Sequence, residues 1–107
     1  MMLKIYFEDM IKRVVKLTFR EDEVETFLNN FEKNKLKIRS FEGCHHLELW
    51  QDKHQSNVFF TYSFWEDEDK LNNYRHSDLF KSVWSKTKIL FSDKPQAWSI
   101  DAIWEGK

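Results

Sequence analysis

The chain has 107 residues, a formal net charge of −1 and 33% charged residues. This balance provides no basic excess for binding a nucleic-acid backbone or an anionic membrane, so we expect neither as a partner. The length suits one domain with its own core, and the single cysteine, Cys44, excludes an internal disulfide.

Residues 1–10 precede the first clear structural pattern, and the sequence leaves them open as an extra edge strand, an exchanged arm or a frayed tail. They contain neither an apolar stretch of signal-peptide length nor a small-residue cleavage site, and no later apolar run approaches membrane length. We therefore expect a cytoplasmic protein in which residues 11–107 form a single domain.

The first strand and first helix are predicted from the residues that follow. Alternating apolar residues indicate a strand over residues 11–19, although Arg13 interrupts its inward face near the beginning. Asp22 and Glu25 have the spacing of a capping box, and the apolar period of the helix that they begin fades near Asn34. We expect a connecting loop after that point, held under the core by Leu36, Ile38 and Phe41.

Two further strands are predicted over residues 44–51 and 58–65, joined by a polar connection. Gly43 precedes the first of them, and we expect it to hold a backbone angle that other residues resist. The second strand, VFFTYSFW, is rich in aromatic and β-branched residues, and both of its faces are largely apolar. A chain of this length has too few helices to cover both faces, so we expect a second copy to cover one of them.

A run of four carboxylates, residues 66–69, lies where the next helix should begin, and negative charge is favourable there. A metal site in this run is disfavoured because the glycine and spacing of a calcium loop are absent. Leu71 and Tyr74 continue one helical face. Ser77 can then cap a second helical segment, whose apolar residues recur at helical spacing as far as Phe91.

Pro95 opens the last predicted strand, over residues 96–104. The resulting order is strand, helix, strand, strand, helix, strand, which predicts an α+β, ferredoxin-like βαββαβ sandwich with an antiparallel sheet. The apolar second face predicts a homodimer in which the two sheets meet as an α+β barrel. Aromatic residues make up 17% of the chain, which indicates an aromatic-lined pocket or a large subunit interface.

Three segments together resemble the antibiotic biosynthesis monooxygenase family: IRSFEGCHHLELWQD, VFFTYSFWEDEDKL and YRHSDLFKSVW. The resemblance extends from Ile11 to Trp104 and depends on the order and spacing of these short motifs. It implies a dimeric α+β barrel and, by analogy with the cofactor-free members, oxygenation of a small aromatic or quinol-type molecule with no cofactor.

The resemblance also implies candidate site residues. In the cofactor-free polyketide oxygenases, an Asn and a Trp on the central strand and a Tyr on the next helix handle the substrate. Here the Trp is retained as Trp65, whereas Thr61 stands at the Asn position and Leu71 at the Tyr position. Tyr74, one helical turn further on, could supply the missing phenol.

Haem-degrading members use a helix His to bind iron and an Asn on the first strand. Those positions correspond here to Trp84 and Val15, which cannot do that work, so the resemblance disfavours haem degradation. His76 lies about two turns before Trp84 and would need a shifted register to serve as an axial ligand.

For a cofactor-free oxygenase, His76 is the candidate base, with Trp65 and Tyr74 as its catalytic partners. A histidine beside a serine cap is also a common surface residue, and core packing explains Trp65 and Tyr74 as well as pocket lining does. The candidate substrate-binding residues are Thr61, Leu71, Trp84 and Arg75.

Arg75 could grip a carboxylate or phenolate, although an ion pair at a helix junction with Ser77 and Asp78 explains it too. No zinc site is expected, because His45 and His46 are strand neighbours that point to opposite faces. Cys44 has no activating partner and is expected to be buried and inert.

The leading hypothesis is therefore a monooxygenase that acts on a small hydrophobic or aromatic molecule. The alternative is a non-catalytic ligand-binding or stress-response dimer of the same fold. An RNA-binding domain has the same order of elements, but the Gly-containing basic-aromatic signature is absent from VFFTYSFW.

Overall fold

The computed structural model describes residues 10–106, and the expectations for an N-terminal extension fall almost entirely on residues 1–9, outside the described residues. The elements are β1 (Ile11–Thr18), a short 3-10 turn η2 (Glu21–Glu23), α1 (Val24–Arg39), β2 (Cys44–Gln51), β3 (Val58–Trp65), α2 (Glu68–Arg75), α3 (Asp78–Lys88) and β4 (Gln96–Ile100). None of these helices is long and apolar enough to cross a lipid bilayer, within the residues described.

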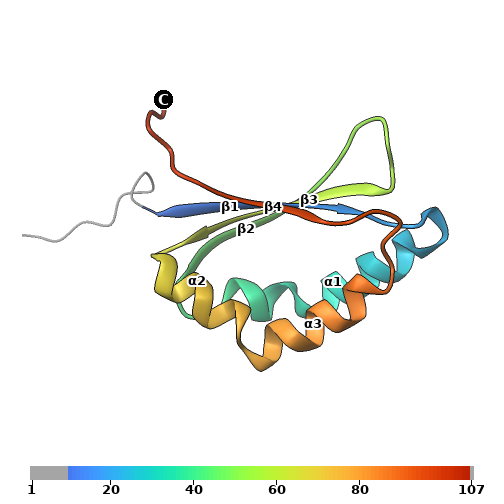
Figure 1. Ribbon diagram of the computed structural model, residues 1–107, viewed down its shortest axis with the longest axis horizontal. Helices are drawn as coiled ribbons and strands as arrows, with labels where there is room; N and C mark the ends of the chain where they lie inside the picture. Colours follow the sequence, from blue (N-terminus) through green and yellow to red (C-terminus); the bar gives the residue numbers. More distant parts are fainter. Residues whose placement is uncertain (1–9, 107) are drawn as a thin grey trace, which may run out of the picture.

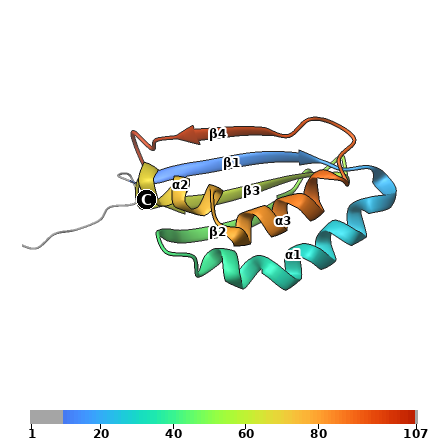
Figure 2. The same ribbon diagram turned by 60° about the horizontal axis from the view of Figure 1, so that its bottom comes forward.

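The four strands form one antiparallel sheet in the order β2-β3-β1-β4. The helices α1, α2 and α3 all lie on one face of this sheet, while the β2–β3 connection and the C-terminal segment rise on the other side (Figure 1). Seen from the helical side, α1 and α3 run side by side over this face of the sheet (Figure 2). This arrangement confirms the predicted ferredoxin-like α+β fold.

The alternation of each strand assigns its residues to a face. On β3, Phe59, Thr61, Ser63 and Trp65 face the helices, and the intervening residues face away from them. The register pairs Ser63 of β3 with Arg13 of β1, so Arg13 also lies on the helical side. We call the opposite side the open face. Its aromatic members Phe60, Tyr62 and Phe64 confirm that β3 is apolar on both sides.

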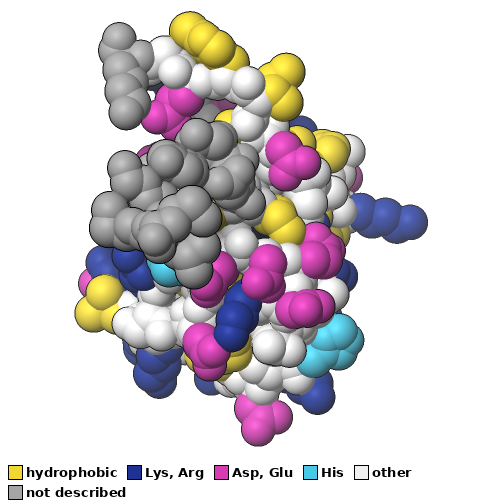
Figure 3. Space-filling model, turned by 90° about the vertical axis from the view of Figure 1, so that its left-hand side faces the viewer, with side chains coloured by type: hydrophobic (Ala, Val, Ile, Leu, Met, Phe, Trp, Pro, Cys, Tyr) yellow, Lys and Arg dark blue, Asp and Glu magenta, His cyan; other side chains and the backbone are white. Residues whose placement is uncertain are grey.

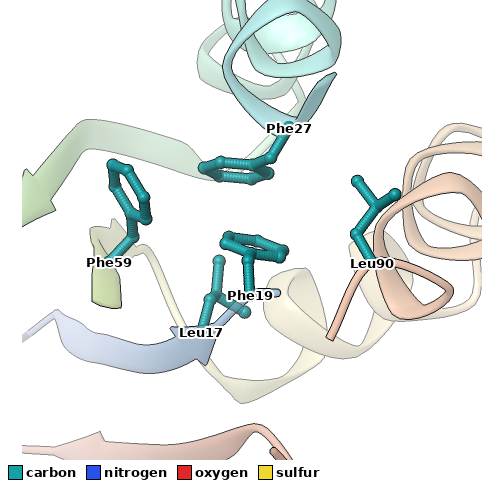
Figure 4. Close-up of a cluster of buried hydrophobic side chains, with 5 residues drawn as sticks. All are labelled: Leu17, Phe19, Phe27, Phe59 and Leu90. Carbon is teal, nitrogen blue, oxygen red and sulfur yellow. The ribbon is translucent and has the colours of Figure 1, made fainter. Parts of the chain in front are cut away.

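Five buried residues form the main core between the sheet and α1 (Figure 4). They are Leu17, Phe19, Phe27, Phe59 and Leu90. The ring of Phe27, from α1, stacks on that of Phe19 with 4.2 Å between ring centroids. Phe19 is fully buried but lies just beyond β1, where it forms an isolated bridge with Phe91, so the predicted strand was one residue too long.

The predicted start and end of the first helix were wrong. The turn η2 takes up the residues around Asp22, and α1 begins after Glu23 with no side-chain capping bond. The helix then continues to Arg39 instead of ending near Asn34, because no Gly or Pro interrupts the chain before Gly43. Leu36 is consequently 72% exposed on the outer side of the helix, although Ile38 is buried as expected.

Strand β4 ends at Ile100, four residues before its predicted end. Among the strands of residues 10–106 it neighbours β1, and the register pairs Ile100 with Lys12 at the beginning of that strand. Within the described residues the pairing with β1 ends there, and Ala102 and Trp104 lie outside the sheet. Gly43, by contrast, has the expected left-handed angle, φ +92°, before β2.

Candidate functional site

A cavity of about 430 Å³ lies between the sheet and the helices, within the size range of small-molecule sites. Its floor is made by small side chains on three adjacent strands. Val15 of β1 pairs with Thr61 of β3 on one side and with Ala97 of β4 on the other, and Ser63 is also part of the lining. Larger residues at these four positions would fill the space, so the pocket follows from the choice of small inward-facing residues.

Aromatic rings from β3, α2 and α3 form a continuous wall. Trp65 stacks on Tyr74 with 4.8 Å between centroids, and Tyr74 meets Phe80 edge-on at 5.2 Å. Phe80 in turn stacks on Trp84 at 5.9 Å. This wall can accept a flat apolar ring by the same stacking and edge contacts.

All seven residues predicted from the sequence line this one cavity: Trp65, His76, Tyr74, Thr61, Leu71, Trp84 and Arg75. They do not offer equal contact to a ligand. Trp65 is only 1% exposed and Leu71 only 2%, so both serve mainly as packing behind the surface. The indole Nε1 of Trp65 donates a hydrogen bond to Ser63 Oγ at 3.0 Å, which holds the ring in place.

His76 lies at the junction between α2 and α3, on the rim of the pocket. Its Nδ1 is 2.8 Å from the carbonyl oxygen of Asn72. A carbonyl oxygen can only accept, so Nδ1 must carry the hydrogen, and the Nε2 atom of the neutral ring keeps its lone pair. Among residues 10–106 no protein group is hydrogen-bonded to Nε2. The ring is exposed and can accept a proton from a bound molecule.

Tyr74 contributes a partly buried phenol that stays protonated. Burial raises the pKa of Tyr74 above its ordinary value, and Cys44 raises it further. A phenol in this state can donate a hydrogen bond but cannot act as a base. Burial also raises the pKa of the Cys44 thiol, in agreement with the inert cysteine expected from the sequence.

Arg13 is a member of the site that the sequence pattern did not predict. Its half-buried guanidinium lines the pocket from β1, and its Nη1 donates to Ser99 Oγ of β4 at 3.0 Å. The signal was present in the sequence as the one charge that interrupted the inward apolar face of the first strand. What the pattern could not show was that Arg75, 62 positions later in numbering, lines the same cavity.

At the junction after Arg75, the predicted cap is confirmed and the predicted ion pair is not. Ser77 Oγ accepts a hydrogen bond from the backbone N–H of Phe80 at 3.0 Å. Within the described part of the chain, the ion pairs do not include one between Arg75 and Asp78. An ion pair with Asp78 therefore does not explain the presence of Arg75 at this junction.

The acidic run at the start of α2 is a helix start, as expected. Asp67 caps the helix by accepting from the backbone N–H of Lys70 at 2.9 Å. Acidic and basic side chains lie intermixed at this end of the molecule (Figure 3). In residues 10–106 no group of three His, Cys, Asp or Glu side chains is arranged to hold a metal ion.

Comparison with known proteins identifies relatives of the chain. The model of the antibiotic biosynthesis monooxygenase family matches residues 10–84. No curated protein matches the sequence significantly.

Several solved structures share the fold at low sequence identity. A candidate antibiotic biosynthesis monooxygenase from Caulobacter crescentus is 22% identical, with a TM-score of 0.82 over 92% of this chain and 93% of the other. Another, from Nitrosomonas europaea, is 11% identical, with a TM-score of 0.84 over 95% and 97%. A conserved protein from Bacteroides thetaiotaomicron, described as a possible oxidoreductase, is 16% identical, with a TM-score of 0.75 over 87% and 99%.

Proposed function

Because the chain belongs to the antibiotic biosynthesis monooxygenase family, we propose that it is a monooxygenase acting on a small aromatic or quinol-type molecule in the pocket between sheet and helices. The proposal rests on one observation: the same cavity has an aromatic wall and, at its rim, a histidine whose Nε2 lone pair is available. The wall can hold the ring of the substrate, and His76 can receive its proton.

The reaction that this arrangement supports uses molecular oxygen and the substrate's own electrons. His76 Nε2 removes a proton from a CH₂ carbon of the keto tautomer of a phenol or quinol, which leaves a carbanion stabilised by the ring. The anion passes one electron to O₂, and the resulting radical and superoxide join in a carbon–oxygen bond. The peroxide anion takes back the proton held by His76, and loss of water from the hydroperoxide then breaks the O–O bond and leaves a carbonyl. One oxygen atom enters the product, and the other leaves as water.

The protein contributes by positioning the substrate and by excluding water from it. Tyr74, kept protonated by burial, can donate a hydrogen bond to the substrate oxygen, and Thr61 Oγ can do so from the floor. The apolar walls limit water around the anion, which favours electron transfer to oxygen over protonation of the carbon. We propose that this happens without an added cofactor.

The test is oxygen uptake by the purified chain with a panel of anthrones and naphthohydroquinones. We expect uptake above the protein-free rate, and we expect His76→Ala to lower kcat about 100-fold or more, as loss of a general base does. His54→Ala is the matched control, because His54 lies in the exposed β2–β3 connection and not in the pocket. Absence of uptake across the panel, or full activity of His76→Ala, would refute the oxygenase assignment.

One observation favours the alternative, a non-catalytic ligand-binding dimer. Trp65, the residue retained from the oxygenase pattern, presents almost no surface to the cavity, and its N–H is already bonded to Ser63. In that case the pocket would bind its ligand without turnover. Binding of an aromatic molecule by a protein that consumes no oxygen would support this assignment.

We also propose that a second copy of the chain covers the open face. Trp50 and Tyr62 stack there with 4.6 Å between ring centroids. Trp98 and Ile100 of β4 are 44% and 48% exposed on the same side. Apolar and aromatic surface of this kind, lying across neighbouring strands, is typical of subunit interfaces.

A further inference from the structure

The pocket contains two arginines in an otherwise largely apolar lining. Arg13 reaches it from the sheet, where it is half-buried, and Arg75 reaches it from the end of α2, where it is exposed at the mouth of the pocket. A partly buried guanidinium is costly unless it is paired, and the hydrogen-bond partner of Arg13 is the neutral hydroxyl of Ser99. This bond holds the guanidinium in place, but the hydroxyl brings no opposite charge to it.

The two guanidinium groups act on one another. Burial lowers the pKa of Arg13, and the positive charge of Arg75 lowers it further, while the carboxylate of Glu68 acts in the opposite direction. Glu68 is exposed at the start of α2 and, in the described residues, forms no ion pair with either arginine within 4.0 Å. Among residues 10–106, therefore, no acidic side chain neutralises either of these two like charges at contact distance.

We infer that the pocket takes a small aromatic carboxylate, whose anionic group is held by Arg13 and Arg75 while its ring lies along the aromatic wall. A guanidinium binds a carboxylate in a planar, bidentate manner, and two of them can hold both of its oxygens. The wall of Tyr74, Phe80 and Trp84 provides stacking and edge contacts for the ring. Binding of an anion would remove the repulsion between the arginines.

The inference specifies the substrate class of the site and rests on the proposed function only in placing the ligand in this pocket. Binding is measurable without turnover. The experiment uses the full chain and titration calorimetry with two probes of nearly equal shape, 2-naphthoate and its neutral amide, 2-naphthamide. We expect 2-naphthoate to bind at least tenfold more tightly than 2-naphthamide.

Substitution of each arginine tests whether it causes the preference for 2-naphthoate. Arg75→Gln and Arg13→Gln are each expected to weaken 2-naphthoate binding about 10- to 100-fold, the effect of losing a charge-assisted hydrogen-bonding partner, and to leave 2-naphthamide binding unchanged. Lys81→Gln removes the same charge from the exposed side of α3 and should change neither. If Arg13→Gln fails to fold, Arg13→Lys replaces it, since it keeps the charge and loses the planar fork.

The outcomes separate this inference from the proposed function. Equal affinity for the two probes, failure of both to bind, or equal loss of both in the arginine variants would overturn the carboxylate assignment. A preference for 2-naphthoate in a protein that consumes no oxygen would uphold the inference and refute the monooxygenase. Oxygen uptake with neutral quinols, together with equal affinity for 2-naphthoate and 2-naphthamide, would uphold the monooxygenase and refute the carboxylate inference.

Discussion

At the scale of single residues, the pocket keeps the phenol of Tyr74 protonated. The pKa of Tyr74 is raised above its ordinary value of 10.0, so the folded protein keeps a proton that the unfolded chain releases more easily. The corresponding stability is fully present below about pH 10 and is lost as the pH rises toward the folded pKa. Alkaline conditions should therefore destabilise the protein through this partly buried phenol.

The prediction is tested with Tyr74→Phe, which keeps the ring stacked on Trp65 and removes the hydroxyl. Between pH 9 and pH 11 the free energy of unfolding of the wild type should fall by about 1 kcal/mol more than that of the variant. Urea unfolding at several pH values measures both. The raised pKa of Cys44 acts in the same direction in both proteins and does not affect the comparison. Parallel pH profiles would show that the phenol is not responsible.

At the scale of elements, the junction of α2 and α3 positions the candidate base. His76 ends α2, and Ser77 begins α3 by accepting from the N–H of Phe80. Ser77→Ala should cost about 0.5–2 kcal/mol of stability, because one of the first backbone N–H groups of α3 loses its partner. Ser82→Ala, at an exposed position within the same helix, should change stability by less than about 0.5 kcal/mol. Urea unfolding of the two variants measures this difference, and equal effects would contradict the capping role.

At the scale of the whole molecule, the open face predicts a dimer. The protein should have twice the chain mass of 13.2 kDa in native mass spectrometry or light scattering. Trp98→Glu places a charge in the proposed interface and should weaken the dimer by about 2 kcal/mol or more, roughly 30-fold in its dissociation constant. Leu36→Glu is the control, since Leu36 is 72% exposed on the helical side. A monomeric wild type at micromolar concentration would exclude the dimer.

The sequence by itself determined those features that depend on near neighbours. The bounds of β2 and β3 agree with prediction, since alternation and polar connections are local signals. The cap at Ser77 and the left-handed Gly43 were predictable for the same reason. The seven candidate site residues line one cavity, because strand alternation, helical spacing and the family resemblance all placed them on one side of the sheet; their roles stay predictions.

Only the tertiary structure decided where elements stop and which distant side chains meet. Strand β4 ends at Ile100 because its partner β1 begins at Ile11, a limit set by pairing and invisible in the apolar pattern of the last segment. In the sequence pattern Arg13 only interrupts the apolar face of a strand, whereas in the fold it lines the same pocket as Arg75. Whether these two side chains meet depends on strand register and on helix position together. The interaction between their charges depends on the distance between them, and the order of residues in the chain does not give that distance.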